Sequence, residues 1–499
     1  MYRLLGILFM CTILQAQDVT VLNLDQAIDI ALESSYEMKS LRLNLTRSEQ
    51  NLIAAKGRFK TNVEASMQVP NWQENVSEIP VPGELPVFNT TGSLRYQGML
   101  DIIQPTPTDG RLTLRSMAYH RDVSTYRASL EQETTRKDMY GSISLRYHQP
   151  LFTINRLKLG LQTANLSYER TEQRYRRSQL DVVYLVTQTF FETYRAKRQK
   201  EIAEQNLKQQ QELFDLATKK YQAGLIPEVE ALQMEVDLAE AKNELLSAEG
   251  RMARSQDAFK QQIGLALSDH IDVTTDISYE RIEVDLNRAL ELALQNRTEI
   301  REAKIDLELA QIDVKEADAQ SEIRGDLNLF YDLTGVSDPT LPGSASVNSL
   351  WTSMTDDMQR RPNNRGVVFT LSVPIWDWGV NAAQVQAAQA SLQNSELDLE
   401  EQKKTIRRQV RDVVASLRET ENRLQVLDKN QQVAQRAFQI SVERFNNGDI
   451  TSQELALDRN RYTQAQTSFL DAYIAYRLAL ADLKRKTMWD FENDRSVVK

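Results

Sequence analysis

The residues Tyr221-Gln222-Ala223-Gly224-Leu225-Ile226 recur in pattern as Phe445-Asn446-Asn447-Gly448-Asp449-Ile450. Both stretches place an aromatic residue three positions before a glycine that interrupts a long helical pattern. Glycine is the usual residue where a helix ends in a left-handed conformation, and helical periodicity resumes directly after each one. The two stretches therefore predict two turns, each joining a pair of long helices.

The number of residues that separates the two turns also separates the matching segments that precede them. Gln149-Pro150-Leu151-Phe152 corresponds to Val373-Pro374-Ile375-Trp376. From these prolines onward, the residues up to about Gly264 align without a gap onto those up to about Met488. A separate matching pair at the start of each copy is Leu24–Leu32 and Leu286–Leu294. Repetition of whole segments in the same order indicates that the chain consists of two copies of one plan.

Ahead of each proline, apolar residues alternate with polar ones. Strict alternation over about eight to ten residues is typical of a strand with one apolar and one polar face. The alternating apolar positions are Val63, Ala65, Met67 and Val69, then Ile143, Leu145 and Tyr147, then Leu327, Leu329, Tyr331 and Leu333, and finally Val367, Phe369, Leu371 and Val373. Soluble hairpins would show the same pattern, so alternation alone does not place these strands in a membrane.

After each proline, a helical pattern runs for about 65 residues and a return leg of about 40 follows the turn. In the second copy, apolar and small residues fall at steps of three and four, with one slip near Gln402. Such a seam is typical of helices that pack as a coiled coil. At ~1.5 Å per residue the long helix spans roughly 100 Å, so it must project from any compact domain.

The composition excludes several classes of function. Arg3, an apolar run from Leu4 to Leu14 and the small residue Ala16 are typical of a cleavable secretory signal at residues 1–16. The only cysteine, Cys11, lies in that segment, so thiol chemistry is not expected in the mature chain. A net charge of −10 argues against a nucleic-acid partner. The three histidines are isolated in the sequence, so we expect no enzyme, cofactor or metal site.

The chain from Leu24 to about Met488 resembles the TolC family of outer-membrane efflux proteins. The resemblance lies in its repeats, in the prolines that follow its strands and in its glycine turns. The resemblance implies a mainly α fold with a membrane β-barrel, in which three chains share a twelve-stranded barrel and an α-helical periplasmic tunnel. It implies an outer-membrane duct of a tripartite efflux or secretion system, which conducts substrate passively to the exterior. The implied partners are a periplasmic adaptor, an inner-membrane pump, further copies of the chain and outer-membrane lipid. The implied location is the cell outer membrane, extending into the periplasm.

Four strands cannot close a barrel alone, and open strand edges are not tolerated in lipid, which independently favours oligomerisation. By resemblance the four strands are about Asn62–Val69, Ser142–Gln149, Asp326–Leu333 and Gly366–Val373. The domain plan is a signal at 1–16, a first equatorial helix at 17–61, a first strand pair at 62–149 with an enlarged outer loop at 70–141, a first long helical hairpin at 150–275, a second equatorial helix at 276–325, a second strand pair at 326–375, and a second hairpin with the C-terminal tail at 376–499.

Two further alternating segments, Leu94–Ile102 and Leu112–Met117, fall within the enlarged loop. We expect them to form an extracellular hairpin, and a periplasmic excursion is the alternative. Trp376, Trp378 and Phe152 lie where strand passes into helix, as in an aromatic girdle at a membrane interface, although packing at the junction would also explain them.

In the family, the two glycine turns form the periplasmic tip where an adaptor docks. The corresponding docking residues here are Tyr221, Gly224, Leu225, Phe445, Gly448 and Asp449. The alternative is that these glycines only end helices.

The family closes this tip by a polar network across the pore, of which the chain keeps only part. The family's tyrosine falls on Phe445 and its arginine on Ile450, while Glu230 and Glu454 stand at the partner acids. These four residues are the expected pore constriction, and six glutamates from three chains would make it cation-selective. A pair of solvated glutamates at helix starts is the alternative.

A secreted periplasmic or surface coiled-coil scaffold or adhesin is the alternative function. It would explain the long helices and the secretory signal, but not four alternating strands in matching pairs.

Overall fold

The computed structural model describes residues 20–80, 82–83, 85–127, 131–277, 279–320, 322–342 and 344–497. The expected signal at residues 1–16 lies outside these ranges. The chain forms two units. A helical unit comprises the residues up to Thr46, Arg170–Lys304 and Leu397–Lys499, and a sheet-containing unit comprises Arg47–Glu169 and Ile305–Glu396.

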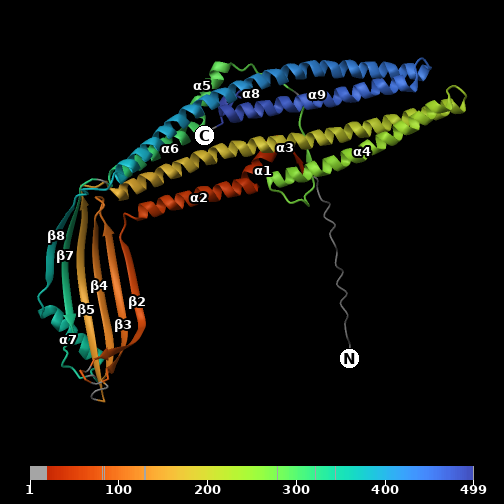
Figure 1. The fold of residues 1–499 in the computed structure, drawn as a ribbon. Coiled ribbons are helices and arrows are strands. Elements are labelled where there is room, and N and C mark those ends of the chain that lie inside the picture. Colours follow the sequence, from red (N-terminus) through yellow and green to blue (C-terminus); the bar gives the residue numbers. More distant parts are fainter. Residues whose placement is uncertain are drawn as a thin grey trace, which may run out of the picture. The chain divides into compact units, whose positions relative to one another are not determined.

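The helices follow the repeat expected from the sequence (Figure 1). Their bounds are α1 Leu24–Ser34, α2 Tyr36–Gly57, α3 Arg156–Gln222, α4 Glu228–Ile263, α5 Leu286–Asn296, α6 Thr298–Asp318, α8 Val380–Asn447 and α9 Ser452–Thr487. The two long helices have 67 and 68 residues, and both return legs, α4 and α9, have 36. The predicted long helical hairpins are therefore confirmed in both copies.

The seam predicted for the second copy is the buried stripe of α8. Ile406, Val410, Val413, Leu417 and Leu424 are all less than 5% exposed. Most of the residues of α8 that lie between these seam positions in the sequence are solvent-exposed, as expected for a helix that packs along a single face.

Large aromatic side chains join the two repeats inside the helical unit. Phe190 of α3 contacts Phe259 of α4, with ring centroids 5.9 Å apart. Phe191 of α3 contacts Tyr473 of α9, with centroids 6.3 Å apart, and both pairs are edge to face. The buried Tyr473 hydroxyl donates a hydrogen bond to the carbonyl of Asp276 at 2.8 Å. In the same unit, β1 Thr20–Leu22 of the first copy pairs in parallel with β6 Ile271–Val273. The duplicated halves are thus packed into one body rather than strung in tandem.

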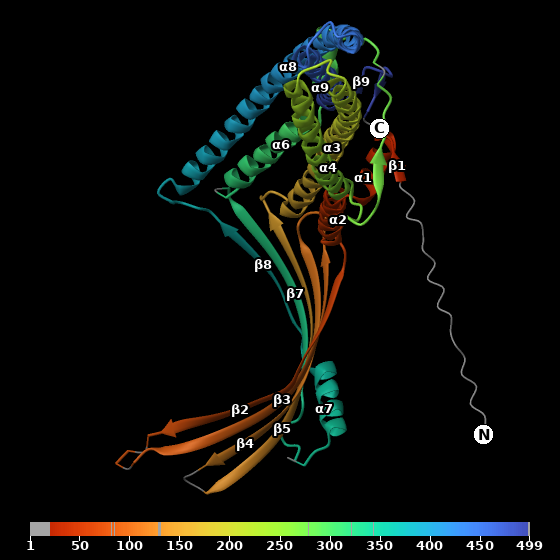
Figure 2. The same ribbon diagram turned by 90° about the vertical axis from the view of Figure 1, so that its right-hand side faces the viewer.

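The second unit is built on a six-stranded sheet, shown in Figure 2, with every neighbouring pair antiparallel. Its strands, in sheet order, are β2 Asn62–Ile79, β3 Val87–Pro105, β4 Arg111–Arg127, β5 Gln132–Leu151, β7 Arg324–Val336 and β8 Asn364–Ser372. The four strands expected from the sequence are β2, β5, β7 and β8. The two additional strands, β3 and β4, lie between β2 and β5 and correct the expected strand count.

The expected enlarged outer loop at 70–141 is consequently not a loop. Leu94–Ile102 lies in β3 and Leu112–Met117 in β4, and both pair along the main sheet. The turn between them lies beside the start of α3, because the Asp109 carboxylate accepts hydrogen bonds from the backbone N–H of Arg156 at 3.1 Å and of Leu157 at 3.3 Å. The expected extracellular hairpin is therefore wrong, since its turn is at the helix end of the sheet.

Two adjacent rows of side chains that cross the sheet differ in polarity. One row of directly opposed residues crosses all six strands and is polar throughout: Glu64, Asp101, Arg115, Ser144, Asp332 and Asn364. The adjacent row, which points to the other face, has apolar residues on five strands: Val63, Ile102, Leu114, Leu145 and Tyr331. Alternation in the sequence thus becomes two chemically distinct surfaces, because successive side chains of a strand point to opposite faces.

A short helix, α7 Val347–Arg360, packs on the sheet where β5 and β7 face each other with glycines. A Cβ on Gly141 would lie 2.6 Å from the sulfur of Met354, and one on Gly335 would overlap the backbone of the same residue. Leu350 and Met354 are buried there against Met139. The two opposed glycines therefore provide the flat surface on which α7 sits.

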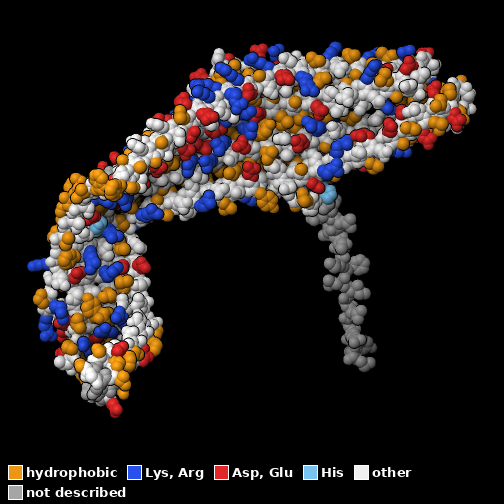
Figure 3. Space-filling view, in the orientation of Figure 1, with side chains coloured by type: hydrophobic (Ala, Val, Ile, Leu, Met, Phe, Trp, Pro, Cys, Tyr) orange, Lys and Arg blue, Asp and Glu red, His pale blue; other side chains and the backbone are white. Residues whose placement is uncertain are grey.

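Aromatic residues are exposed where β8 leads into α8, and Figure 3 shows hydrophobic side chains gathered over this end of the sheet. Trp376 and Trp378 are 75% and 87% exposed and Phe152 is 67% exposed. Trp376 and Trp378 pack edge to face on each other, with ring centroids 5.5 Å apart, yet both remain largely exposed within a single chain. Their exposure favours the expected aromatic girdle over packing at the junction. Among the described helices, none is both long and apolar enough to cross a membrane.

Candidate functional site at the hairpin tips

The two predicted turns have the same backbone geometry. Gly224 and Gly448 have φ of +73° and +86°, in the left-handed region. Gly224 donates to the Tyr221 carbonyl at 2.9 Å and Leu225 to Lys220 at 2.9 Å. The second turn repeats both bonds, from Gly448 to Phe445 at 3.1 Å and from Asp449 to Arg444 at 2.9 Å. This pairing of bonds is the Schellman motif, so each glycine does end its helix as the sequence suggests.

The expected docking residues divide into exposed and buried ones. Tyr221 is 41% and Leu225 72% exposed, and Asp449 is also exposed. A Cβ placed on Gly224 or on Gly448 would meet no atom within 4 Å, so both turns border open space.

Phe445, by contrast, is only 2% exposed, and its ring lies beneath the turn. It belongs to an apolar cluster with Leu213, Ala217, Met234, Phe438 and Leu455, and Ile450 packs against that cluster. The structure therefore does not place Phe445 on the outer surface of the tip. Within one chain, Phe445 and Ile450 support the turns from below.

The two expected constriction glutamates have different environments. The Glu454 carboxylate accepts hydrogen bonds from the Thr451 N–H at 3.0 Å and from the Thr451 hydroxyl at 3.3 Å, and the Thr451 hydroxyl caps the Glu454 N–H. This reciprocal arrangement is a capping box, which stabilises the start of α9. Glu230 is half-buried in the first turn of α4. Helix capping thus accounts for Glu454, whereas Glu230 has no equivalent capping box.

Lys220, which the sequence analysis did not single out, connects the two tips. Its Nζ donates to the backbone carbonyls of Phe445 at 2.7 Å and Asn446 at 3.2 Å, and lies 4.8 Å from the centroid of the Phe445 ring. The last carbonyls of a helix attract a cation because they have no partner within the helix. A basic residue in the last turn of α3 was the available signal, but its partner on the other hairpin could not be inferred from spacing.

Two further polar contacts lie behind the tips. Arg459 of α9 faces Asp237 of α4 across 3.7 Å, and both side chains are at most 10% exposed. Burial lowers the pKa of Arg459, although Asp237 opposes that shift. The Ser441 hydroxyl of α8 donates to the Asp458 carboxylate at 2.6 Å. The hairpins are therefore held together by specific polar contacts as well as by the apolar cluster.

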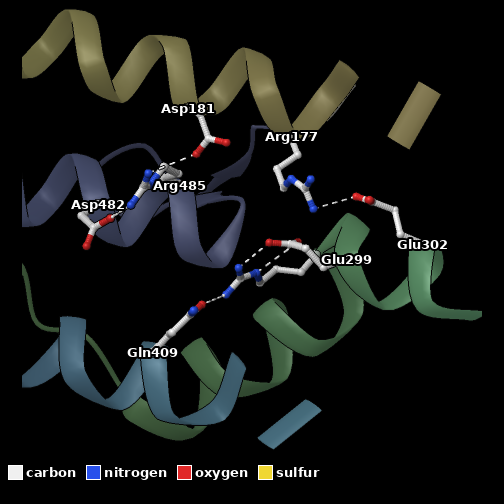
Figure 4. A network of polar contacts seen from close by, with 8 residues as sticks. Arg177, Asp181, Glu299, Glu302, Gln409, Asp482 and Arg485 are labelled. Atoms are coloured by element: carbon white, nitrogen blue, oxygen red, sulfur yellow. Dashed lines mark hydrogen bonds and ion pairs between the residues drawn. The ribbon is translucent and has the colours of Figure 1, made fainter. Parts of the chain in front are cut away.

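A larger polar network links four helices of the helical unit (Figure 4). Arg297 pairs with Glu299 and donates to Gln409 of α8 at 2.6 Å. Arg177 of α3 lies 2.9 Å from Glu302 of α6. In the same region, Arg485 of α9 bridges Asp181 of α3 at 3.1 Å and Asp482 at 2.7 Å.

Two glutamates of this network have opposite pKa shifts. Burial alone would raise the pKa of Glu299, but its hydrogen bonds with Arg297 prevail and lower it. For Glu302, burial outweighs the charges of Arg177 and Arg174, so its pKa is raised. Nothing in the spacing of the charged residues along these helices distinguishes the buried glutamates from solvated ones.

Two stretches of the chain match the family model described as outer membrane efflux protein, residues 119–265 and 337–487. Together they cover more than half of the chain and correspond to its two repeats. The chain belongs to the outer membrane efflux protein family. This efflux protein is accordingly a channel of the cell outer membrane that extends into the periplasm, and it is not an enzyme. The expected relation to the TolC family is confirmed, and nothing supports a scaffold or adhesin.

Solved structures of similar fold agree with this assignment. CusC, described as undergoing transmembrane channel formation, matches with a TM-score of 0.66 at 15% identity, covering 93% of this efflux protein and 91% of CusC. The CmeC outer membrane channel of Campylobacter jejuni gives 0.67 at 13% identity, covering 93% and 85%. The outer membrane protein VceC of Vibrio cholerae gives 0.64 at 14%, covering 93% and 95%. At such identities the likeness shows a shared fold. No curated protein sequence matches the chain.

Proposed function

We propose that three copies of this chain assemble into one duct, and that a periplasmic adaptor joins its hairpin tips to an inner-membrane pump. The observation that supports assembly is the open sheet: its two edge strands, β2 and β8, have no further strand partner within the described chain. Open edges are not tolerated in lipid. Because β2 runs away from the helices and β8 returns toward them, β8 of one copy can pair antiparallel with β2 of the next.

The mass of the assembly tests this proposal. In mild detergent, native mass spectrometry should report three chains, held together without disulfides because Cys11 is the only cysteine in the sequence. A monomer that stays folded without detergent would overturn the proposal.

The exposed surface of the tips supports adaptor docking. Leu225 and the neighbouring Val229 are 72% and 68% exposed, next to the half-exposed ring of Tyr221. Gly224 and Gly448 add no side chain, so a partner's backbone can approach both turns closely. We therefore assign the docking surface to Tyr221, Gly224, Leu225, Gly448 and Asp449, supported from beneath by Phe445.

A bulky side chain on the tip should block docking. We expect Gly224→Arg or Gly448→Arg to abolish export while trimers still form. Gly224→Ala separates backbone strain from bulk, because it adds a strain of about 1–2 kcal/mol in the left-handed region but little volume. Gly83→Arg is the matched control, since Gly83 also has a positive φ of +85° and open space but lies in the turn between β2 and β3. Normal export by both arginine variants at the tips, at equal protein levels, would show that the turns are only structural.

The constriction is proposed at the same tips. Glu230 and Glu454 would place six carboxylates around the threefold axis, over the apolar layer that contains Phe445 and Ile450. The proposed role of the two glutamates in the pore can be tested apart from helix capping, because Glu454 forms a capping box and Glu230 does not.

A further inference from the structure

The strands β3 and β4 have the same surface chemistry as the strands expected to span the membrane. Leu100 of β3 and Leu114 of β4 are 41% and 38% exposed, and Ile143 and Leu145 of β5 are 40% and 41% exposed. The register places these side chains on one face: Leu114 opposes Leu145, and Leu114 also opposes Ile102, two residues from Leu100. The apolar surface therefore continues without interruption from β5 across β4 and β3.

The opposite face of β3 and β4 carries a paired charged row, and Met99 and Met117 oppose each other two positions further along that face. Arg115 donates two hydrogen bonds to Asp101, at 2.7 and 2.9 Å, across the strand pair. The same row continues into β5 and β7 through the hydrogen bond between Ser144 and Asp332. A strand that spans a membrane as part of a water-filled barrel has this division, with apolar side chains outward and polar side chains toward the lumen.

The hairpin formed by β3 and β4 also cannot be detached from the barrel wall without breaking the sheet. β2 has hydrogen-bonded partners only in β3, and β5 pairs with β4 and β7, so β2 reaches the rest of the sheet only through the hairpin. A four-stranded wall made of β2, β5, β7 and β8 would need a pairing of β2 with β5 that the structure does not contain.

We infer that all six strands of each chain span the outer membrane, so that three chains form a barrel of eighteen strands in place of the expected twelve. The inference rests on the proposed trimer. Barrel diameter grows roughly linearly with strand number, so this lumen is about one and a half times as wide as that of a twelve-stranded barrel of similar tilt. Barrels of about 16–18 strands leave an aqueous channel. The barrel therefore admits bulky hydrophilic cargo, and selection by size falls to the periplasmic tips.

Cysteine labelling in intact outer membranes tests the position of the hairpin. Leu114→Cys on the apolar face and Thr113→Cys on the polar face of β4 are compared, with Leu145→Cys of β5 as the reference for a lipid-facing position. A membrane-impermeant maleimide should label Thr113→Cys and leave Leu114→Cys as protected as Leu145→Cys. Labelling of Leu114→Cys as rapid as that of Thr113→Cys, with Leu145→Cys still protected, would place the hairpin outside the membrane and overturn the inference.

Electron cryo-microscopy of the protein in lipid nanodiscs counts the strands directly. Eighteen strands around one lumen in a particle of three chains is the expected result. Three chains around twelve strands would overturn the inference and leave the proposed trimer intact. A particle of any other number of chains would refute the trimer, and the strands per chain would then still show whether six or four span.

Discussion

Replacement of Lys220 should loosen the contact between the two hairpin tips. Its ammonium group donates to the carbonyls of Phe445 and Asn446 and lies over the Phe445 ring. Methionine keeps most of the length and apolar volume of the side chain and removes the charge and the donors. Lys219→Met is the matched control, because Lys219 is the same residue type one position earlier and is exposed.

The magnitude follows from the contacts. Hydrogen bonds to a charged group contribute about 1.5–3 kcal/mol, and the half-exposed setting of Lys220 places them at the lower end. A cation over an aromatic ring at an exposed site adds about 0.5–1 kcal/mol. A total of about 2 kcal/mol corresponds to a change of roughly 30-fold in the local opening equilibrium, since about 1.4 kcal/mol is a factor of ten.

Amide hydrogen exchange followed by mass spectrometry measures this opening equilibrium. In Lys220→Met, the amides at the end of α8 and the start of α9 should exchange roughly 30-fold faster than in the parent protein. The amides of the aromatic core around Phe190 should be unchanged. Equal exchange at the tips in Lys220→Met and Lys219→Met would refute the reasoning, because the bridge would then contribute no more than an exposed lysine.

Four further predictions concern other residues of the chain. Because the pKa of Glu299 is lowered in the fold, its ionised form stabilises the protein above the ordinary glutamate pKa, and this contribution declines as pH falls toward the folded-state pKa. Glu299→Gln should therefore reduce the melting temperature at pH 7, and by progressively less as the pH is lowered through the acid range. Glu302 has a raised pKa, which favours the folded state at low pH, so Glu302→Gln should cost less at pH 7 than Glu299→Gln; the reverse order would contradict the assignment. In planar bilayers, Glu230→Gln with Glu454→Gln should weaken divalent block from the periplasmic side and cation selectivity, and unchanged block would leave both as helix-start residues. Gly335→Ala should displace α7, at a cost of about 1–3 kcal/mol, and limited proteolysis should then cut the segment between β7 and β8 faster than in the parent protein.

The helical hairpins could be predicted because their signals are local. A seam at steps of three and four and a glycine after an aromatic residue are both contained in a short stretch of sequence, and α3, α4, α8 and α9 formed where these signals stood. The turn geometry at Gly224 and Gly448 likewise follows from the residue type.

Strand pairing could not be predicted in the same way, because it joins residues distant in sequence. The alternation in Leu94–Ile102 and Leu112–Met117 was visible, but alternation does not state which strand lies next to which. The family's count of four strands then assigned both segments to a loop, whereas the structure inserts them between β2 and β5. Lys220 and Glu302 were missed for a related reason, since each depends on a partner from another helix.

The central claim, that this sheet lies in the outer membrane around a water-filled lumen, is tested most directly on β7. Single cysteines at Asn328 and Leu329 point to opposite faces of the sheet, and Asn328 shares its face with His148 while Leu329 shares its face with Tyr147. In intact outer membranes, a membrane-impermeant maleimide should label Asn328→Cys, and a lipid-soluble photoreactive probe should label Leu329→Cys. Equal aqueous labelling of both positions, in protein that is recovered without detergent, would contradict the account.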